Sequence, residues 1–137
     1  MRHPVASLCA LAALLSASGA RAESIDQVRR GFAQMIYQDS RADINLAPPQ
    51  SMLRAVVVLR VRLDDHGRWK AEVMRENDVE PGLTRKALAS VEHLAEALPV
   101  SAGMSEQLHR EGFVEVWLFQ NDGRFALKTL ALPQRRF

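Results

Sequence analysis

The feature that most constrains the fold is a pair of alternating apolar runs joined by a short polar turn. Apolar side chains recur at every second position over residues 54–63, and again over 69–74. The tetrapeptide Asp64–Gly67 joins the two runs, and its glycine suits the positive φ of a tight turn. This stretch predicts a β-hairpin, which commits the chain to an antiparallel sheet.

Two other stretches carry apolar residues at helical spacing. Ser24 and Gln27 match a capping box at the start of a helix predicted over 25–38. A second helix is predicted over 81–97 and is ended by Pro99. We interpret the apolar stripe of each helix as the face that packs against a core.

The remaining segments complete an α-β-β-α-β-β order. Residues 39–53 are predicted as a connection, and the stretch after Pro99 as a loop with a short helical turn near Ser105–His109. Residues 113–119 are predicted as a strand, and an Asn-Asp-Gly turn leads to a last strand over 124–132. The sequence therefore predicts a two-layer α+β domain with two helices and an antiparallel sheet of three to four strands.

We expect the core to lie between the sheet and the helices. Its predicted members are Leu59, Val61, Trp69, Val73, Leu88, Val91 and Trp117. Strand 113–119 is apolar on both faces, so both faces should be covered. The domain's own helices cover one face. For the other face, the N-terminal helix, a second copy of the chain and a foreign partner remain open, and the N-terminal helix ranks first.

The first residues have the layout of a secretory signal peptide. A basic start at Arg2 precedes an apolar run over Val5–Leu15, and small residues at Ala20 and Ala22 predict cleavage after Ala22. The run is shorter than the roughly 20 residues of a transmembrane helix. We therefore expect a periplasmic protein with no integral membrane segment after cleavage.

Cleavage would divide the chain into a signal peptide (1–22), an N-terminal amphipathic helix with its connection (23–53), the α+β domain (54–132) and a tail (133–137). The leader contains two of the 18 basic residues and no acid, which leaves 16 basic against 16 acidic residues. It also contains Cys9, the only cysteine. A neutral chain without cysteine argues against nucleic-acid binding, disulfides and thiol chemistry.

Candidate reactive groups are few. Asp64–His66 combines two acids and a histidine, but consecutive turn residues point in different directions, so a backbone-bonded turn is favoured over a metal or acid–base site. The sequence has no nucleophile elbow and no phosphate-binding glycine loop. We expect no enzyme, catalytic residue, metal or cofactor. Arg60 and Arg62 share a strand face and are candidates for contacting an anion, or for pairing with Glu72.

The stretch 55–99 resembles the C-terminal domain of the TonB and TolA proteins of the Gram-negative envelope. The shared features are an alternating strand, a D-x-x-G turn, a second strand, a helix and a proline after the helix. The helix pattern is carried by Leu83, Ala87, Leu88, Ala89 and Val91. The helix before the hairpin resembles the TolA branch, whereas the Tyr-Pro motif of TonB-type domains and the cysteine pair of many TolA domains are missing.

The resemblance implies protein binding by strand addition, in which a partner peptide pairs with an exposed sheet edge. Most TonB-type domains offer the strand after the second helix, which corresponds to strand 113–119. The residues on one face of this candidate partner-binding strand are Phe113, Glu115, Trp117 and Phe119. If the last strand covers that edge, binding would move to strand 68–76 or to the outer side of the last strand.

We therefore expect a soluble periplasmic protein–protein interaction module that binds an envelope protein or peptide, with a homo-oligomer as another option. Because a signal peptide replaces the anchor and spacer of the family, we expect an accessory of envelope transport and not an anchored energy transducer. The alternative is a periplasmic small-molecule or anion-binding protein with a groove between the sheet and the N-terminal helix. A dry core with no polar-lined pocket of about 300 Å³ or more would disfavour this alternative.

Overall fold

The computed structural model of the chain describes residues 24–76, 80–95 and 98–133. The predicted signal peptide over 1–22, its cleavage site and most of the predicted tail lie outside the described residues. Within the described ranges, no helix is both long and apolar enough to cross a membrane.

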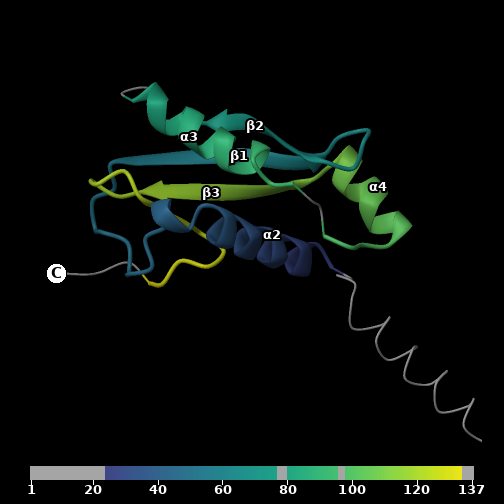
Figure 1. The fold of residues 1–137 in the computed structure, drawn as a ribbon, viewed down its shortest axis with the longest axis horizontal. Coiled ribbons are helices and arrows are strands. Elements are labelled where there is room, and N and C mark those ends of the chain that lie inside the picture. Colours follow the sequence, from purple (N-terminus) through teal and green to yellow (C-terminus); the bar gives the residue numbers. More distant parts are fainter. Residues whose placement is uncertain (1–23, 77–79, 96–97, 134–137) are drawn as a thin grey trace, which may run out of the picture.

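The described part of the chain contains three helices and four strands, which confirms the predicted α+β class and adds one helix. The helices are α2 (Ile25–Asp39), α3 (Pro81–Glu92) and α4 (Ala102–Arg110), and a short 3-10 turn, η1, covers Arg41–Asp43. The strands are β1 (Ala55–Leu63), β2 (Trp69–Arg75), β3 (Phe113–Phe119) and β4 (Phe125–Leu127). They are ordered β2-β1-β3-β4, and all neighbours are antiparallel. Figure 1 labels β2, β1 and β3, which lie in this order.

Helix α2 begins at the predicted capping box. The Ser24 side chain accepts a hydrogen bond from the Gln27 backbone N–H at 3.2 Å, and the Gln27 side chain accepts one from the Ser24 N–H at 3.0 Å. These bonds satisfy donors that the first helical turn would leave without partners. The residues that the helix buries are Val28, Phe32, Ala33 and Ile36.

The β1–β2 hairpin is closed by Asp64. Its carboxylate accepts backbone hydrogen bonds from Arg68 at 2.9 Å and from His66 at 2.8 Å, while Gly67 has a φ of 74°. Both bonds lower the pKa of Asp64, and the bond from Arg68 has the larger effect. The turn interpretation of Asp64–Gly67 is therefore confirmed.

Helix α3 begins at Pro81, as predicted, but ends at Glu92 and not near residue 97. Its inward face runs through Ala87 and Val91, which are fully buried. Leu88 was predicted in the core and is only partly buried, because it lies at the flank of that face.

The stretch after Pro99 holds the helix α4, where the sequence predicted a loop with one short helical turn. Ser101 caps this helix by accepting a hydrogen bond from the Met104 N–H at 3.1 Å. Met104 and Leu108 are its buried residues. The prediction was wrong in extent, because only two buried side chains, Met104 and Leu108, mark the inward face of this helix of 9 residues. In Figure 1, α4 lies at one end of the strands.

Strand β3 has the predicted bounds, whereas β4 is much shorter than the predicted strand over 124–132. The turn before β4 is tight, and Gly123 has a φ of 83°. After Leu127 the chain turns again, because the Leu127 carbonyl accepts hydrogen bonds from Leu130 at 3.0 Å and Ala131 at 2.8 Å. As a result, β4 pairs only with the end of β3, from Trp117 onward.

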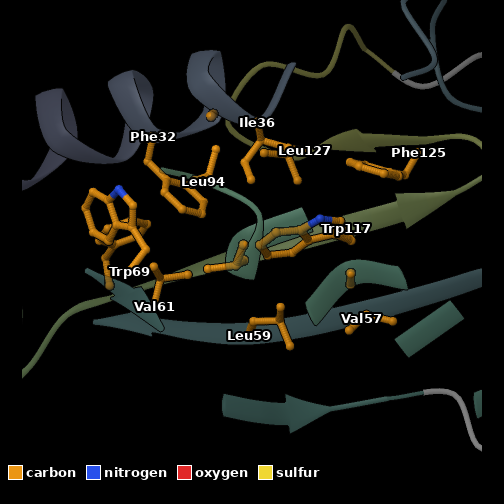
Figure 2. Packing of buried hydrophobic residues seen from close by; sticks show 14 of the residues in the cluster. Phe32, Ile36, Val57, Leu59, Val61, Trp69, Leu94, Trp117, Phe125 and Leu127 are labelled. Carbon is orange, nitrogen blue, oxygen red and sulfur yellow. The ribbon is translucent and has the colours of Figure 1, made fainter. Parts of the chain in front are cut away.

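Phe32 of α2 lies at the centre of the core. Its ring packs edge-on against Trp69, with ring centroids 5.2 Å apart, and against Phe113 at 5.3 Å. Figure 2 shows this ring between α2 and the sheet. Leu59 and Val61 of β1 are fully buried in the same core. Five members of the predicted core are buried as expected, namely Leu59, Val61, Trp69, Val91 and Trp117.

Both α2 and α3 cover the same face of the sheet. The Trp117 ring lies 6.4 Å from the Phe32 ring, and its indole N–H donates to the Ser90 hydroxyl of α3 at 3.1 Å. The first-ranked expectation, that the N-terminal helix covers the other face of β3, is therefore wrong. The residues on that other face are Val114, Val116 and Leu118, and they are only partly buried.

Val73 of β2 is the second correction to the predicted core. Its side chain is 41% exposed, although Trp69 at the start of the same strand is only 5% exposed. Strand β2 has a neighbour on one side only, β1. A side chain on such an edge strand is covered from above by helices but stays open on its outer flank, which the alternating pattern of the sequence does not reveal.

Candidate strand-binding edge

The hydrogen-bond phase of the β1–β2 ladder decides which backbone groups of β2 face outward. The Asp64 N–H donates to the Arg68 carbonyl at 2.8 Å, so Arg68 points its backbone groups toward β1. In an antiparallel ladder this direction alternates with each residue. Lys70 and Glu72 therefore also bond toward β1, and the odd-numbered residues between them point away.

Trp69, Ala71 and Val73 direct their backbone N–H and C=O groups to the outer side of β2. No hydrogen bond to these outward groups is found among the described residues. A row of such groups is the template that an added strand pairs with. We call this row the β2 edge.

The side chains beside the β2 edge leave it accessible. Lys70, Glu72 and Arg75 are exposed, and Met74 is 50% exposed. The strand has 7 residues, which is long enough for an added strand to make several bonds in register. Lys70 and Glu72 project from one face of β2, and Trp69, Ala71 and Val73 project from the other.

The outer edge of β3 is less open. Val116 receives a hydrogen bond at its carbonyl from the Lys128 N–H at 3.0 Å, and its N–H donates to the Glu115 carboxylate at 2.9 Å. By alternation, Val114 is the next residue of β3 that points outward, and β4 does not reach it. The edge that the family resemblance indicated is thus covered over its second half and offers little more than Val114.

A groove of about 600 Å³ lies beside this part of β3. Its walls include Arg29 and Arg30 of α2, Val114 and Glu115 of β3, and Lys128. Arg29 is already held, because its guanidinium pairs with Asp26 at 2.7 Å and lies over the Phe113 ring. The groove is lined by more basic than acidic side chains, which suits an anionic group at its rim.

The four side chains predicted on the partner-binding strand lie in the core, so they do not form an exposed surface. The exposed fractions of Phe113, Glu115, Trp117 and Phe119 are 3%, 2%, 0% and 0%. On β3, a partner could meet only the backbone edge and the partly buried side chains of the opposite face, Val114, Val116 and Leu118. Phe119 packs against Phe125 of β4, with ring centroids 5.5 Å apart.

Glu115 is a buried acid on an otherwise apolar face. Its Oε1 accepts hydrogen bonds from the backbone N–H groups of Val116 at 2.9 Å and Thr129 at 3.4 Å. Its Oε2 is buried and has no partner among the residues that the structure describes. Burial raises the pKa of Glu115, and the hydrogen bonds only partly oppose that shift. The carboxylate thus takes the place of a strand partner where β4 ends.

Arg60 and Arg62 lie together on the strand face, as predicted. Arg62 pairs with Glu72 at 3.3 Å, and Arg60 donates to the Glu111 carbonyl at 2.9 Å. A pocket of about 220 Å³ lies between these arginines and Lys70. Both arginines have protein partners, so their part in anion contact stays a prediction.

The Asp64–His66 turn lies next to α4. His109 is 3.1 Å from the Leu63 carbonyl and 3.4 Å from the Asp65 carboxylate. The described residues contain no group of three or more histidine, cysteine, aspartate or glutamate side chains that could hold a metal ion.

Sequence reasoning named strand 68–76 only as an alternative to strand 113–119. The signal for the β2 edge was present in the run from Trp69 to Met74, where charged residues alternate with apolar ones. Lys70 and Glu72 mark a wet face, but they do not show which side of the strand is unpaired. Comparison of the chain with protein-family models, curated proteins and solved structures finds no match. The resemblance to the TonB and TolA domains therefore stays a prediction.

Proposed function

We propose that this protein is a periplasmic protein–protein interaction module that accepts an extended partner strand at the β2 edge. The observation that carries the proposal is the row of outward backbone groups at Trp69, Ala71 and Val73, which have no partner in the described part of the chain. Backbone pairing supplies affinity in strand addition, and alternate side chains supply specificity. The partner is an envelope protein or an exported peptide, and the module acts as an accessory of envelope transport.

The side chains on β2 suit an amphipathic partner strand. The inner face of β2 continues the apolar core through Trp69 and Ala71 to the exposed Val73. The opposite face of β2, which points away from the helices, carries Lys70 and Glu72. A bound strand should therefore alternate apolar residues toward the helices with charged residues on the opposite face.

A proline at position 73 tests the proposal. The Val73 N–H points outward, so Val73→Pro removes a bond that only an added strand would use, and edge strands tolerate such a proline. Val73→Thr is the matched control, because threonine keeps both the branched shape and the N–H. Linear peptides would first be selected from a phage-displayed random library against the dilute wild-type protein.

The selected peptides should bind the wild type and Val73→Thr, and binding to Val73→Pro should fall roughly tenfold or more, as expected for lost backbone pairing. They should also slow amide hydrogen exchange at Ala71 and Val73, with little change at Val114. Equal binding to all three proteins, or protection centred on Val114, would show that the β2 edge is not the binding site.

The groove beside Val114 favours a second candidate function, an anion-binding or small-molecule-binding protein. Its volume is about 600 Å³, which exceeds the about 300 Å³ below which we expected this alternative to be disfavoured. Arg30 and Lys128 are exposed cations at this groove. A thermal-shift screen of small carboxylates and phosphates would test it. A stabilising ligand whose effect is lost in Arg30→Gln and Lys128→Gln would support this function.

A further inference from the structure

We propose that the β2 edge pairs with the β2 edge of a second copy of this chain, which would join two sheets into one continuous sheet. This inference rests on the proposed function, because it names the partner that supplies the added strand. It is carried by the charge pattern of β2, which is complementary to itself when the strand is turned end for end.

The register of the pairing follows from the hydrogen-bond phase. Trp69, Ala71 and Val73 point outward, so these residues must face one another across the new ladder. An antiparallel pairing centred on Ala71 places Trp69 opposite Val73 of the second copy. Each of these pairs can exchange both backbone hydrogen bonds.

The same register places Lys70 directly opposite Glu72 of the second copy. Two-fold symmetry repeats this pair, since Glu72 then lies opposite Lys70 of the second copy. These are the closely spaced, non-hydrogen-bonded positions of the ladder, where opposite charges stabilise the pairing and like charges oppose it. On the other face, the exposed Val73 would lie directly opposite Trp69 of the second copy.

Neighbouring registers are less favourable. Moving the centre of symmetry by one residue toward the turn places Lys70 opposite Lys70 of the second copy. Moving it by one residue the other way places Glu72 opposite Glu72. The sequence of β2 therefore favours the register centred on Ala71 over both neighbours.

Charge reversal at these two positions tests the pairing in solution. Sedimentation equilibrium of the protein from residue 23 onward should show a dimer in the wild type. Lys70→Glu and Glu72→Lys should each raise the dimer dissociation constant roughly tenfold or more, because each creates two like-charge pairs.

Mixing the two variants separates a specific pairing from general damage to the strand. In an equimolar mixture, one copy carries acids at positions 70 and 72 and the other carries bases at both. Every cross-strand pair is then again between opposite charges, so the mixture should restore a dimer. Arg41 of η1 and Glu106 of α4 are exposed charges outside the sheet, so Arg41→Glu and Glu106→Lys are matched controls that should leave dimerisation unchanged.

A wild type that stays monomeric up to about 1 mM would overturn the inference. So would a dimer that is insensitive both to these reversals and to Val73→Pro, since it would use another surface. Peptide selection on Lys70→Glu, which should be monomeric, tests the proposed function separately. Peptides that bind its β2 edge would uphold strand addition even if the wild type never dimerised. If neither peptides nor a second copy used the edge, both proposals would fall.

Discussion

Truncation of Phe32 to alanine should remove most of the attachment of α2 to the sheet. The ring is fully buried and touches three other aromatic rings, those of Trp69, Phe113 and Trp117. Alanine at this position would leave a cavity at the junction between α2 and the two strands β2 and β3. The free energy of unfolding should therefore fall by an amount at the upper end of the range for core substitutions.

The magnitude follows from the contacts. Phenylalanine-to-alanine changes in a core cost about 3–5 kcal/mol. Edge-to-face ring pairs add about 0.5–1.5 kcal/mol beyond burial, and the closest pairs of Phe32 are those with Trp69 and Phe113, at 5.2 and 5.3 Å. Because the cavity figure already contains part of the ring contacts, we expect a loss of about 4–5 kcal/mol. That is a large share of the about 5–15 kcal/mol that holds an average domain folded.

Urea unfolding followed by tryptophan fluorescence measures this loss directly, since Trp69 lies beside the substituted ring. Gln34→Ala on the exposed face of α2 is the control and should change stability by less than about 0.5 kcal/mol. If Phe32→Ala does not fold, Phe32→Leu should lose about 1–2 kcal/mol and keep the fold. A loss below about 1.5 kcal/mol for the alanine variant would mean that α2 is not packed on the sheet as described.

Three further predictions concern a buried acid, a glycine and the hairpin turn. The pKa of Glu115 is raised on folding, so the wild type should lose stability as pH rises from the pKa of the unfolded state through that of the folded state. Urea titrations at a series of pH values measure this loss. In Glu115→Gln, the free energy of unfolding should change less with pH over the same range. Gly112→Ala should cost about 2 kcal/mol or more by urea unfolding, because φ is 66° and a Cβ there would run into the Val61 carbonyl; unchanged stability would contradict this backbone geometry. Treatment with EDTA should leave the melting temperature unchanged, since backbone hydrogen bonds satisfy Asp64; a drop of several degrees would point to a bound metal at the turn.

The α+β class could be predicted because local signals and hydrophobic periods agree over most of the chain. The capping box at Ser24, the turn at Gly67 and the strand over 113–119 are all short-range features, and each is found where the sequence indicated. Local chemistry decides such elements, because capping and turn geometry need only residues a few positions apart. Tertiary packing then selects which helical face is buried, and this is why Leu88 lies outside the core while Ala87 lies in it.

The elements that were misjudged depend on contacts between distant segments. Helix α4 is short and is held by two buried residues, Met104 and Leu108. Strand β4 ends at Leu127 for two reasons. Glu115 of β3 accepts a hydrogen bond from the Thr129 N–H, and local turn bonds direct the chain away from β3 after Leu127. The residues that contact these two segments come from other parts of the chain, so the sequence of each segment alone does not reveal them. Helix α2 likewise shares the face covered by α3, although either face of β3 is apolar enough to receive it.

The candidate binding edge is a consequence of one closing bond in the hairpin. The bond from the Asp64 N–H to the Arg68 carbonyl sets the phase of the ladder, and this phase turns Trp69, Ala71 and Val73 outward. A turn longer by one residue would shift the pairing by one position and turn Lys70 and Glu72 outward instead. The Lys70–Glu72 pairs between two copies would then occupy the more widely spaced, hydrogen-bonded positions of the ladder. The four-residue turn over Asp64–Gly67 therefore links local hairpin chemistry to the surface on which strand pairing depends.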